Sequence, residues 1–155
     1  NTAVIPAGCL RESVAEAFKR AEAVVMIGRD QHFIMPTIPK HLTLLRGTIH
    51  ATIPETVKDK RVVAFCGIGR PRKFYDTLQK YSVDVVETQD FADHHPFTEA
   101  ELQALMKRAD VLDAVLLTTE KDWVRLSDTW RERIHFLPIT LSLEPRSLLK
   151  KILKL

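Results

Sequence analysis

The chain has 155 residues, of which 45% are hydrophobic and 28% are charged, a composition typical of a globular domain with a buried core and not of a disordered chain. Its 23 basic and 20 acidic residues leave a net charge of +3, which is too small to indicate a nucleic-acid partner. No apolar run approaches the length that spans a bilayer. Cys9 and Cys66 are too far apart in sequence to suggest a disulfide framework or a cysteine zinc site, so we expect a reducing, cytoplasmic environment.

The chain begins at Asn1 without an initiator Met, and we expect that a preceding segment is missing. The first part then predicts a helix at residues 12–20 and a buried strand at 23–27, where a continuous apolar run ends at Gly28. Residues 42–53 predict one long extended strand. The polar segment 54–60 begins with Pro54 and predicts a boundary, so we expect two regions, 1–57 and 58–155.

The second region alternates between strands and helices. The predicted elements are a strand at 62–66, a helix at 71–81, a strand at 83–86, a helix that begins after Thr98, and strands at 114–117 and 134–141 before a last helix at 145–154. Thr98 and Glu101 have the spacing of a capping box. Alternation of this kind predicts an α/β fold, with a mostly parallel sheet, flanking helices and right-handed crossovers.

Ligands of such sheets bind beyond the carboxyl ends of the strands, and three loops are predicted there. The first contains Gly67, Gly69 and Arg70 and leads into a helix with Pro71 at its first position. The glycines allow a sharp turn and the helix N-terminus favours an anion. The loop has neither the third glycine of a dinucleotide fingerprint nor the Gly-Lys-Ser/Thr of a phosphate loop, so a plain strand-to-helix turn remains an equal alternative.

The second loop runs Phe91-Ala92-Asp93-His94-His95-Pro96-Phe97, with Asp90 directly before it. An imidazole beside a carboxylate can act as a general base or a metal ligand, and the carboxylate orients the ring. We favour a functional role for this loop over a structural one. Adjacent histidines tend to point apart, which argues against a metal site that uses both.

The third loop, Thr118-Thr119-Glu120-Lys121-Asp122-Trp123, directly follows a buried strand. Its hydroxyls and charges could hold a nucleotide or orient a loop. A helix cap with an exposed ion pair is the commoner arrangement. The last helix also allows two interpretations, because its leucines and lysines suit either a helix that packs on the core or one that lies on an anionic membrane.

Four segments taken together resemble the tetraacyldisaccharide 4'-kinase family, the lipid A 4'-kinases of Gram-negative bacteria. They are Pro6–Glu12, Ala64–Gly69, Phe91–Thr98 and Thr119–Asp122, in this order. The resemblance implies a two-domain kinase of the phosphate-loop type that uses ATP and Mg²⁺ to phosphorylate a lipid disaccharide at the cytoplasmic face of the inner membrane. Family members are about twice as long as this chain.

The resemblance implies that this chain is the C-terminal half of such an enzyme. The phosphate loop, the metal-binding acids and the lipid-binding surface would lie in the missing N-terminal half, which would be the partner of this chain. Residues 1–57 would be a remnant of that kinase domain with linker strands, and peripheral membrane contact is expected.

The same resemblance implies the roles of individual residues. His94 corresponds to the catalytic histidine, with Asp93 beside it, and its orienting carboxylate would be Asp90 or an aspartate of the missing half. Gly67, Gly69, Arg70, Thr119, Lys121 and Asp122 are expected to line the nucleotide, and no metal ligand is assigned in this chain. Two positions depart from the family pattern, Cys9 in place of Pro and Arg70 in place of Asn, and the second puts the ligand role of the glycine loop in question.

Two other functions remain as alternatives. Asp-His-His is also the signature of a family of Mn²⁺-dependent phosphoesterases, but those enzymes need further acidic motifs such as Asp-x-Asp, which the sequence lacks. The chain could instead be a non-catalytic fragment.

Overall fold

The computed structural model describes residues 3–8, 10–31 and 33–153, without the side chains of residues 150, 151 and 153. The chain divides into two compact units, one of residues 1–50 and 141–155 and the other of residues 51–140. Two strands, β2 and β7, cross the boundary between them. The expected division after residue 57 assigned residues 141–155 to the second region, whereas their contacts group them with the N-terminal segment, because β7 continues beside β2.

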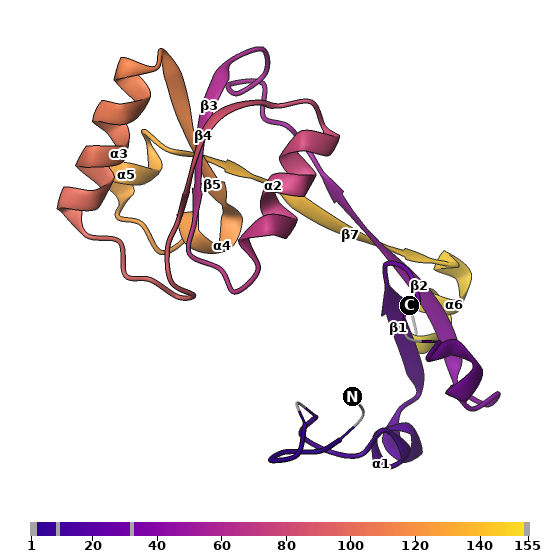
Figure 1. The fold of residues 1–155 in the computed structure, drawn as a ribbon. Coiled ribbons are helices and arrows are strands. Elements are labelled where there is room, and N and C mark those ends of the chain that lie inside the picture. The colour runs from indigo at the N-terminus through magenta and orange to yellow at the C-terminus, as the bar shows by residue number, and fades with distance from the viewer. Residues whose placement is uncertain (1–2, 9, 32, 154–155) are drawn as a thin grey trace. The chain divides into compact units, whose positions relative to one another are not determined.

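The first unit is built on a three-stranded sheet with the order β1-β2-β7 (Figure 1). Its elements are α1 (Val14–Arg20), β1 (Ala23–Ile27), the 3-10 helix η1 (Met35–Thr37), β2 (Thr43–Ala51), β7 (Ile139–Glu144) and α6 (Arg146–Leu153). β1 and β2 are parallel, from Ala23 beside Thr43 to Ile27 beside Gly47. Gly47 is needed for close packing, because a Cβ there would lie 3.0 Å from the Ile27 side chain and 3.1 Å from that of Leu141.

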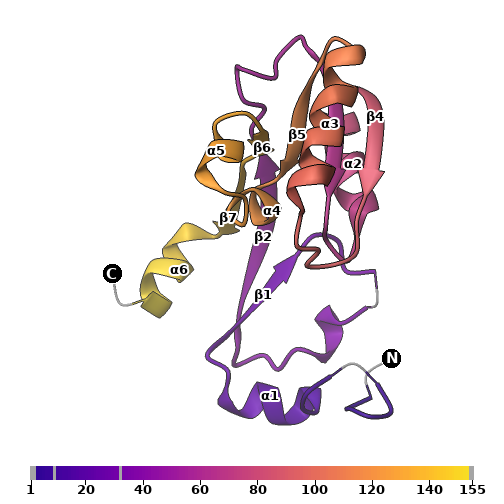
Figure 2. The same ribbon diagram turned by 90° about the vertical axis from the view of Figure 1, so that its left-hand side faces the viewer.

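The second unit has a four-stranded parallel sheet with the order β4-β3-β5-β6. Its elements are β3 (Arg61–Cys66), α2 (Pro71–Lys80), β4 (Asp84–Asp90), α3 (Glu99–Val111), β5 (Ala114–Thr119), α4 (Glu120–Trp123), α5 (Asp128–Arg131) and β6 (His135–Leu137). Helices α2 and α3 cover opposite faces of this sheet, and in Figure 2 α3 lies in front of the strands and α2 behind them. The expected α/β architecture with a parallel sheet and flanking helices is confirmed.

The central strand β3 separates two apolar clusters. Its alternate side chains Val62, Ala64 and Cys66 pack with Phe74 and Leu78 of α2 on one face. Val63 and Phe65 pack on the other face, in a cluster that includes Leu102, Leu105 and Ala109 of α3 and Trp130 of α5. Because β3 is buried on both faces, it anchors the loop that leaves its carboxyl end.

Several boundaries differ from the sequence prediction. The strand predicted at residues 134–141 is two strands, β6 and β7, which are separated at Pro138. Proline has no N–H to donate to a ladder, which explains the break. β4 extends to Asp90, beyond the predicted end at residue 86, and the short helices α4 and α5 were not predicted individually. Cys66 is buried with a free thiol, whereas Cys9 lies outside the described residues.

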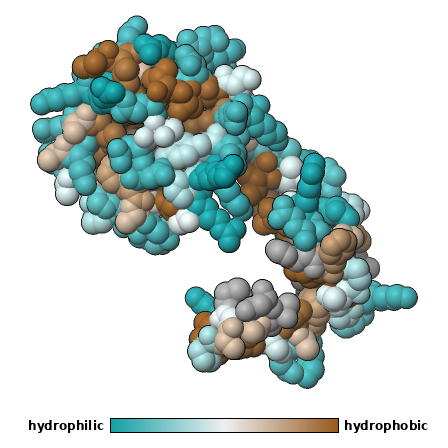
Figure 3. Space-filling view, in the orientation of Figure 1, coloured by the Kyte–Doolittle hydropathy of each residue, from teal (hydrophilic) through white to brown (hydrophobic). Residues whose placement is uncertain are grey.

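The first unit exposes apolar side chains of its sheet. The apolar strand predicted at residues 23–27 is present as β1, and in this chain Val25 is 44% exposed and Ile27 is 53% exposed. Ile49 of β2 is also half exposed, and Figure 3 shows apolar surface among the polar side chains of this part of the chain. Among the described residues, no helix combines the length and the apolar character needed to cross a bilayer.

The α3 face of the second unit makes a test of the fold possible. Replacing Leu102, which is 3% exposed, with Ala should lower the free energy of unfolding by about 2–5 kcal/mol, because it removes buried apolar contacts and leaves a cavity. Urea unfolding followed by the fluorescence of Trp123 and Trp130 measures this change. Val111→Ala on the same helix is the control, since Val111 is 76% exposed; an equal loss in both variants would contradict the packing.

Candidate active site

Three loops meet at the carboxyl edge of the second sheet. They follow β3, β4 and β5, which are adjacent and parallel and therefore end at the same side. The loops are Gly67–Arg70, Phe91–Phe97 and the turn of α4 that begins after Thr119. Backbone hydrogen bonds join the first two, from the Phe91 amide to the Cys66 carbonyl at 2.9 Å and from the His94 amide to the Gly67 carbonyl at 3.0 Å.

Gly67 and Gly69 of the first loop lie close to neighbouring atoms and do not have a positive φ. In the described chain the only glycine with a positive φ is Gly28. A Cβ on Gly67 would lie 3.2 Å from the Ala92 carbonyl oxygen, and one on Gly69 would lie 3.3 Å from Asp93 Oδ2. The glycines were expected to allow a sharp turn. The structure shows in addition that the Asp93–His95 loop packs against them.

His94 is the most prominent polar side chain of the site. Its backbone is in the left-handed region, with φ 60°, and its side chain is 66% exposed. The His94 carbonyl accepts a hydrogen bond from Arg125 Nη2 at 2.6 Å. Both of its backbone polar groups are therefore held while the imidazole faces solvent.

A cation and a carboxylate lie beside the His94 ring. Lys121 Nζ is 3.5 Å from His94 Nε2 and 3.6 Å from Asp93 Oδ1, and Asp93 Oδ1 is 3.9 Å from His94 Nε2. These distances are loose and the side chains are about half exposed, so the pairs add little stability. Chemically, the group combines a proton acceptor with an ammonium that can attract an anionic ligand.

His95 points into the protein instead. Its ring stacks on Phe91, with centroids 4.9 Å apart, and meets the edge of Phe97 at 5.5 Å. Nε2 of His95 lies 3.0 Å from the Glu101 carboxylate. The expectation that the two histidines point apart agrees with these contacts, and His95 connects the loop to the start of α3.

The predicted capping box of α3 is present. The Glu101 amide donates to Thr98 Oγ1, and the Thr98 amide donates to Glu101 Oε2 at 2.8 Å. The Thr98 amide, the His95 ring and the Thr98 hydroxyl, in order of decreasing effect, lower the pKa of the Glu101 carboxyl to about 2. The carboxylate therefore stays ionised at any physiological pH and holds the second loop.

Asp122 lies inside the protein, with no exposed surface. Its Oδ2 accepts hydrogen bonds from the Gly67 amide at 2.9 Å and from Thr119 Oγ1 at 2.8 Å. Thr119 caps α4 by accepting from the Asp122 amide. The contacts of Thr119 and Asp122 within the protein order the loops, and the expectation that these two residues line a nucleotide stays a prediction. Lys121, which belongs to the same turn, does reach the exposed surface beside His94.

Asp90 has a partner other than His94. The Tyr75 hydroxyl donates to Asp90 Oδ1 at 2.5 Å, and burial together with this bond raises the pKa of Tyr75. The phenol therefore keeps its proton and ties α2 to the end of β4. Asp90 was one of two expected orienting carboxylates for His94, and the described contacts assign it to Tyr75 instead.

Three basic residues at the end of the glycine loop and the start of α2 are exposed: Arg70, Arg72 and Lys73. Arg70 precedes α2 without making a side-chain cap. They leave positive charge at the N-terminus of this helix. Arg125 was not singled out from the sequence, although it follows Asp122 by three residues, a spacing that places two side chains on the same side of a helical turn.

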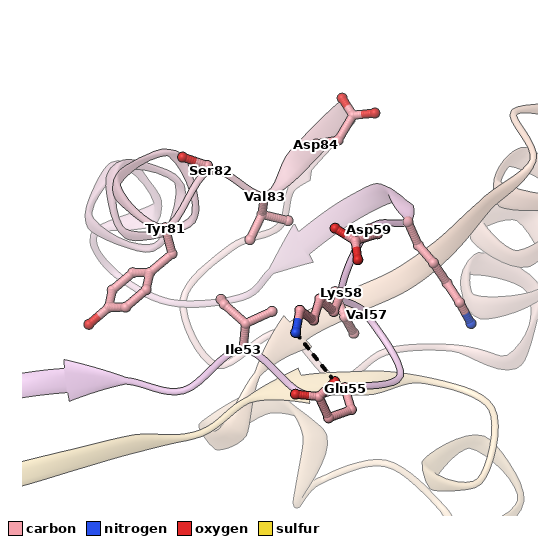
Figure 4. A pocket seen from close by; sticks show the side chains of 10 residues that line it. Ile53, Glu55, Val57, Lys58, Asp59, Tyr81, Ser82, Val83 and Asp84 are labelled. Atoms are coloured by element: carbon pink, nitrogen blue, oxygen red, sulfur yellow. Dashed lines mark ion pairs between the residues drawn. The ribbon is translucent and has the colours of Figure 1, made fainter.

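The described residues contain no group of three or more His, Cys, Asp and Glu side chains arranged to hold a metal ion. A pocket of about 610 Å³ lies elsewhere on the second unit, at the start of β3 and β4 (Figure 4). It has Ile53, Val57 and Val83 in its wall and a Glu55–Lys58 ion pair at 3.8 Å. It is therefore at the opposite edge of the sheet from the three loops.

Comparisons with known proteins give a consistent result. The family model described as "Tetraacyldisaccharide-1-P 4'-kinase" matches residues 1–155. The tetraacyldisaccharide 4'-kinase of Rhodospirillum centenum is 44% identical over 99% of this chain and 46% of its own length, and that of Gluconobacter oxydans is 39% identical over 91% of this chain and 43% of its own. The chain spans about half the length of the curated relatives it matches.

A solved structure has the same fold. It is a crystal structure of LpxK from Aquifex aeolicus in complex with ATP, with a TM-score of 0.70 and 24% identity. The matched region includes 99% of this chain and 48% of the crystallised chain.

The capping box and His95 generate a prediction about pH. Because the folded Glu101 carboxyl binds its proton less readily than an unfolded one, whose pKa is about 4.3, the stability it adds is present above pH 4.3 and is lost as the pH falls toward 2. NMR titration of the Glu101 carboxyl should give a midpoint near 2, which rises in His95→Gln. Glu99, whose carboxyl accepts from Trp130 at 2.7 Å, should not respond to that change. A wild-type Glu101 midpoint near 4.3 would contradict the network.

Proposed function

The chain belongs to the tetraacyldisaccharide 4'-kinase family, and on this premise we propose that it forms the C-terminal half of an enzyme that phosphorylates the 4'-hydroxyl of a tetraacylated disaccharide with ATP. Family membership supports kinase chemistry and the substrate class. The half-length match to the relatives supports a role as one part of the enzyme. The remaining half would supply the phosphate loop, since no Gly-Lys-Ser/Thr occurs in this sequence.

The observation that carries the proposal is the exposed imidazole of His94 beside an ammonium at the edge of the sheet. A sugar hydroxyl must lose a proton as it attacks the γ-phosphoryl group, and an imidazole at physiological pH can accept one. We assign this role to His94. Asp93 lies within 3.9 Å of the ring, and a carboxylate of the other half could orient it further.

Lys121 and Arg70 are suited to the phosphates of ATP. Phosphoryl transfer depends on positioning and on neutralising the charge of the transferred group. Lys121 has its ammonium next to the proposed base, and Arg70 is exposed before the N-terminus of α2, where backbone N–H groups favour anions. Gly69 is exposed and would let the loop approach the nucleotide closely, whereas Gly67 is buried against the loop that follows β4.

The part of the chain that the structure describes presents no acidic cluster suited to Mg²⁺. Asp93 is paired with Lys121, Asp122 is buried among protein donors, and the described residues show no cluster of acidic ligands. We therefore place the metal ligands in the other half of the enzyme and derive no step through the ion.

The other half would also cover the first unit. Its sheet exposes Val25, Ile27 and Ile49, an apolar surface that a partner domain would bury. Peripheral contact with the cytoplasmic face of the inner membrane is proposed for the assembled enzyme, whose substrate is a lipid. In α6, Leu148, Leu149 and Ile152 are half-buried, which suits the interpretation of this helix as packed on the protein.

The two alternative functions make different predictions. An Asp-His-His phosphoesterase would bind Mn²⁺ through acidic clusters, whereas family membership and the Asp93–Lys121 pair favour the kinase. A non-catalytic fragment would bind no nucleotide. Stabilisation against heat by ATP separates these cases, because a ligand that binds only the folded state raises Tm.

The 155-residue chain alone should have no kinase activity, because it has no phosphate loop to hold the β- and γ-phosphates. The assay is transfer of labelled phosphate from ATP to a tetraacylated disaccharide by the purified chain. A full-length relative under the same conditions is the positive control. Turnover by the isolated chain would show that its own residues suffice for phosphoryl transfer and would overturn the division of roles.

In a full-length enzyme, His94→Ala should lower kcat by about 10²–10⁴-fold, the usual cost of losing a general base, with little change in KM for ATP. His95→Ala should mainly lower Tm, because its ring packs between Phe91 and Phe97 and bonds Glu101. Steady-state kinetics and thermal unfolding of both variants measure the difference. A larger loss of kcat in folded His95→Ala would reverse the assignment, and no loss in either variant would end the catalytic interpretation of the loop.

A further inference from the structure

The backbone of His94 is held by two separate routes. Its amide donates to the Gly67 carbonyl at 3.0 Å, and its carbonyl accepts from Arg125 Nη2 at 2.6 Å. With φ at 60°, His94 is in a region that residues with a side chain seldom adopt. A residue in this conformation needs surrounding contacts that keep it there.

Both routes end on the carboxylate of Asp122. On one side the Gly67 amide donates to Asp122 Oδ2 at 2.9 Å, so Gly67 connects Asp122 to the His94 amide. On the other side Arg125 Nη1 lies 3.8 Å from Asp122 Oδ1, while its Nη2 binds the His94 carbonyl. One buried side chain therefore contacts both groups that hold the histidine.

The burial of Asp122 explains why Arg125 takes this position. The carboxylate has no exposed surface, and within the described residues its Oδ1 has no hydrogen-bond donor. A buried charge is costly unless it is paired. The Arg125 guanidinium, whose side chain is 32% exposed, is the cation that faces this oxygen, and its second nitrogen is then directed to His94.

We propose that Asp122 and Arg125 are positioning residues that hold His94, through its backbone, in the orientation that presents its imidazole to substrate. Neither residue needs to touch the nucleotide or the sugar. This inference rests on the proposed function for its effect on turnover, but the positioning itself concerns only contacts within this chain. A merely structural role, as a cap and anchor of α4, is the alternative.

The test compares Arg125→Ala with Arg131→Ala in a full-length enzyme. Arg131 is a matched control, because its guanidinium donates to the Trp123 and Val124 carbonyls of the same segment and pairs with Asp128. We expect Arg125→Ala to lower kcat by roughly 10- to 100-fold with KM for ATP within about twofold, and Arg131→Ala to leave kcat unchanged. Asp122→Asn, which keeps an acceptor for Gly67 but loses the charge that faces Arg125, should act in the same direction.

A double-mutant cycle with His94→Ala separates positioning from stability. If Arg125 acts through His94, Arg125→Ala should cause no further loss of kcat once the imidazole is gone. An equal loss of kcat in the wild-type and His94→Ala backgrounds would overturn the proposal. Arg125 variants decide this even if Asp122→Asn does not fold.

Hydrogen exchange gives a result that does not depend on the reaction. The His94 amide should exchange at least tenfold faster in Arg125→Ala than in the wild type or in Arg131→Ala. Unchanged exchange at His94 would overturn the positioning role. If His94→Ala left turnover intact, the proposed function would fail, and faster exchange in Arg125→Ala would still support the positioning of this loop.

Discussion

The hydrogen bond from the Gly67 amide to the buried Asp122 carboxylate joins the ends of two adjacent strands, β3 and β5, and the loop after β4 is attached to it through the Gly67 carbonyl. In a parallel sheet each strand end carries a loop that would otherwise move independently. A carboxylate with no exposed surface is costly to leave unpaired, so its donors are strongly favoured to stay in place. The geometry of the whole carboxyl edge therefore depends on a carboxylate with no exposed surface.

Much of the second unit follows from local sequence patterns. Three local signals each predict an element from a few residues, and the structure contains all three elements. They are the apolar run at residues 62–66, Pro71 at a helix start and the Thr98 capping box. The break at Pro138 and the extension of β4 to Asp90 were missed. Strand ends depend on which neighbour is available for pairing, and that information is not local.

The site was less predictable than the fold. The three loops could be found, because each follows a strand, but the partners of their side chains depend on distances between loops. Asp90 pairs with Tyr75 rather than with His94, and Glu101 serves both its helix and His95. Asp122 gave no sign of burial in the sequence, where it sits between Lys121 and Trp123 as part of a polar turn. In the folded chain its carboxylate accepts from the Gly67 amide of the glycine loop and from the Thr119 hydroxyl.

The difference between the two histidines follows from the same contacts. A ring that is packed against phenylalanines and bonded to an ionised carboxylate is well placed to stabilise a loop, but it cannot meet a substrate without losing those contacts. His94 has an exposed ring on a backbone that is held by hydrogen bonds, so its ring can meet a substrate without losing packing contacts. The His94 backbone is held by the bond from Arg125 to its carbonyl, while its imidazole is exposed. His95 thus anchors the loop through its ring, while the exposed ring of His94, on a backbone with φ 60°, is the one to which we assign the proposed chemistry.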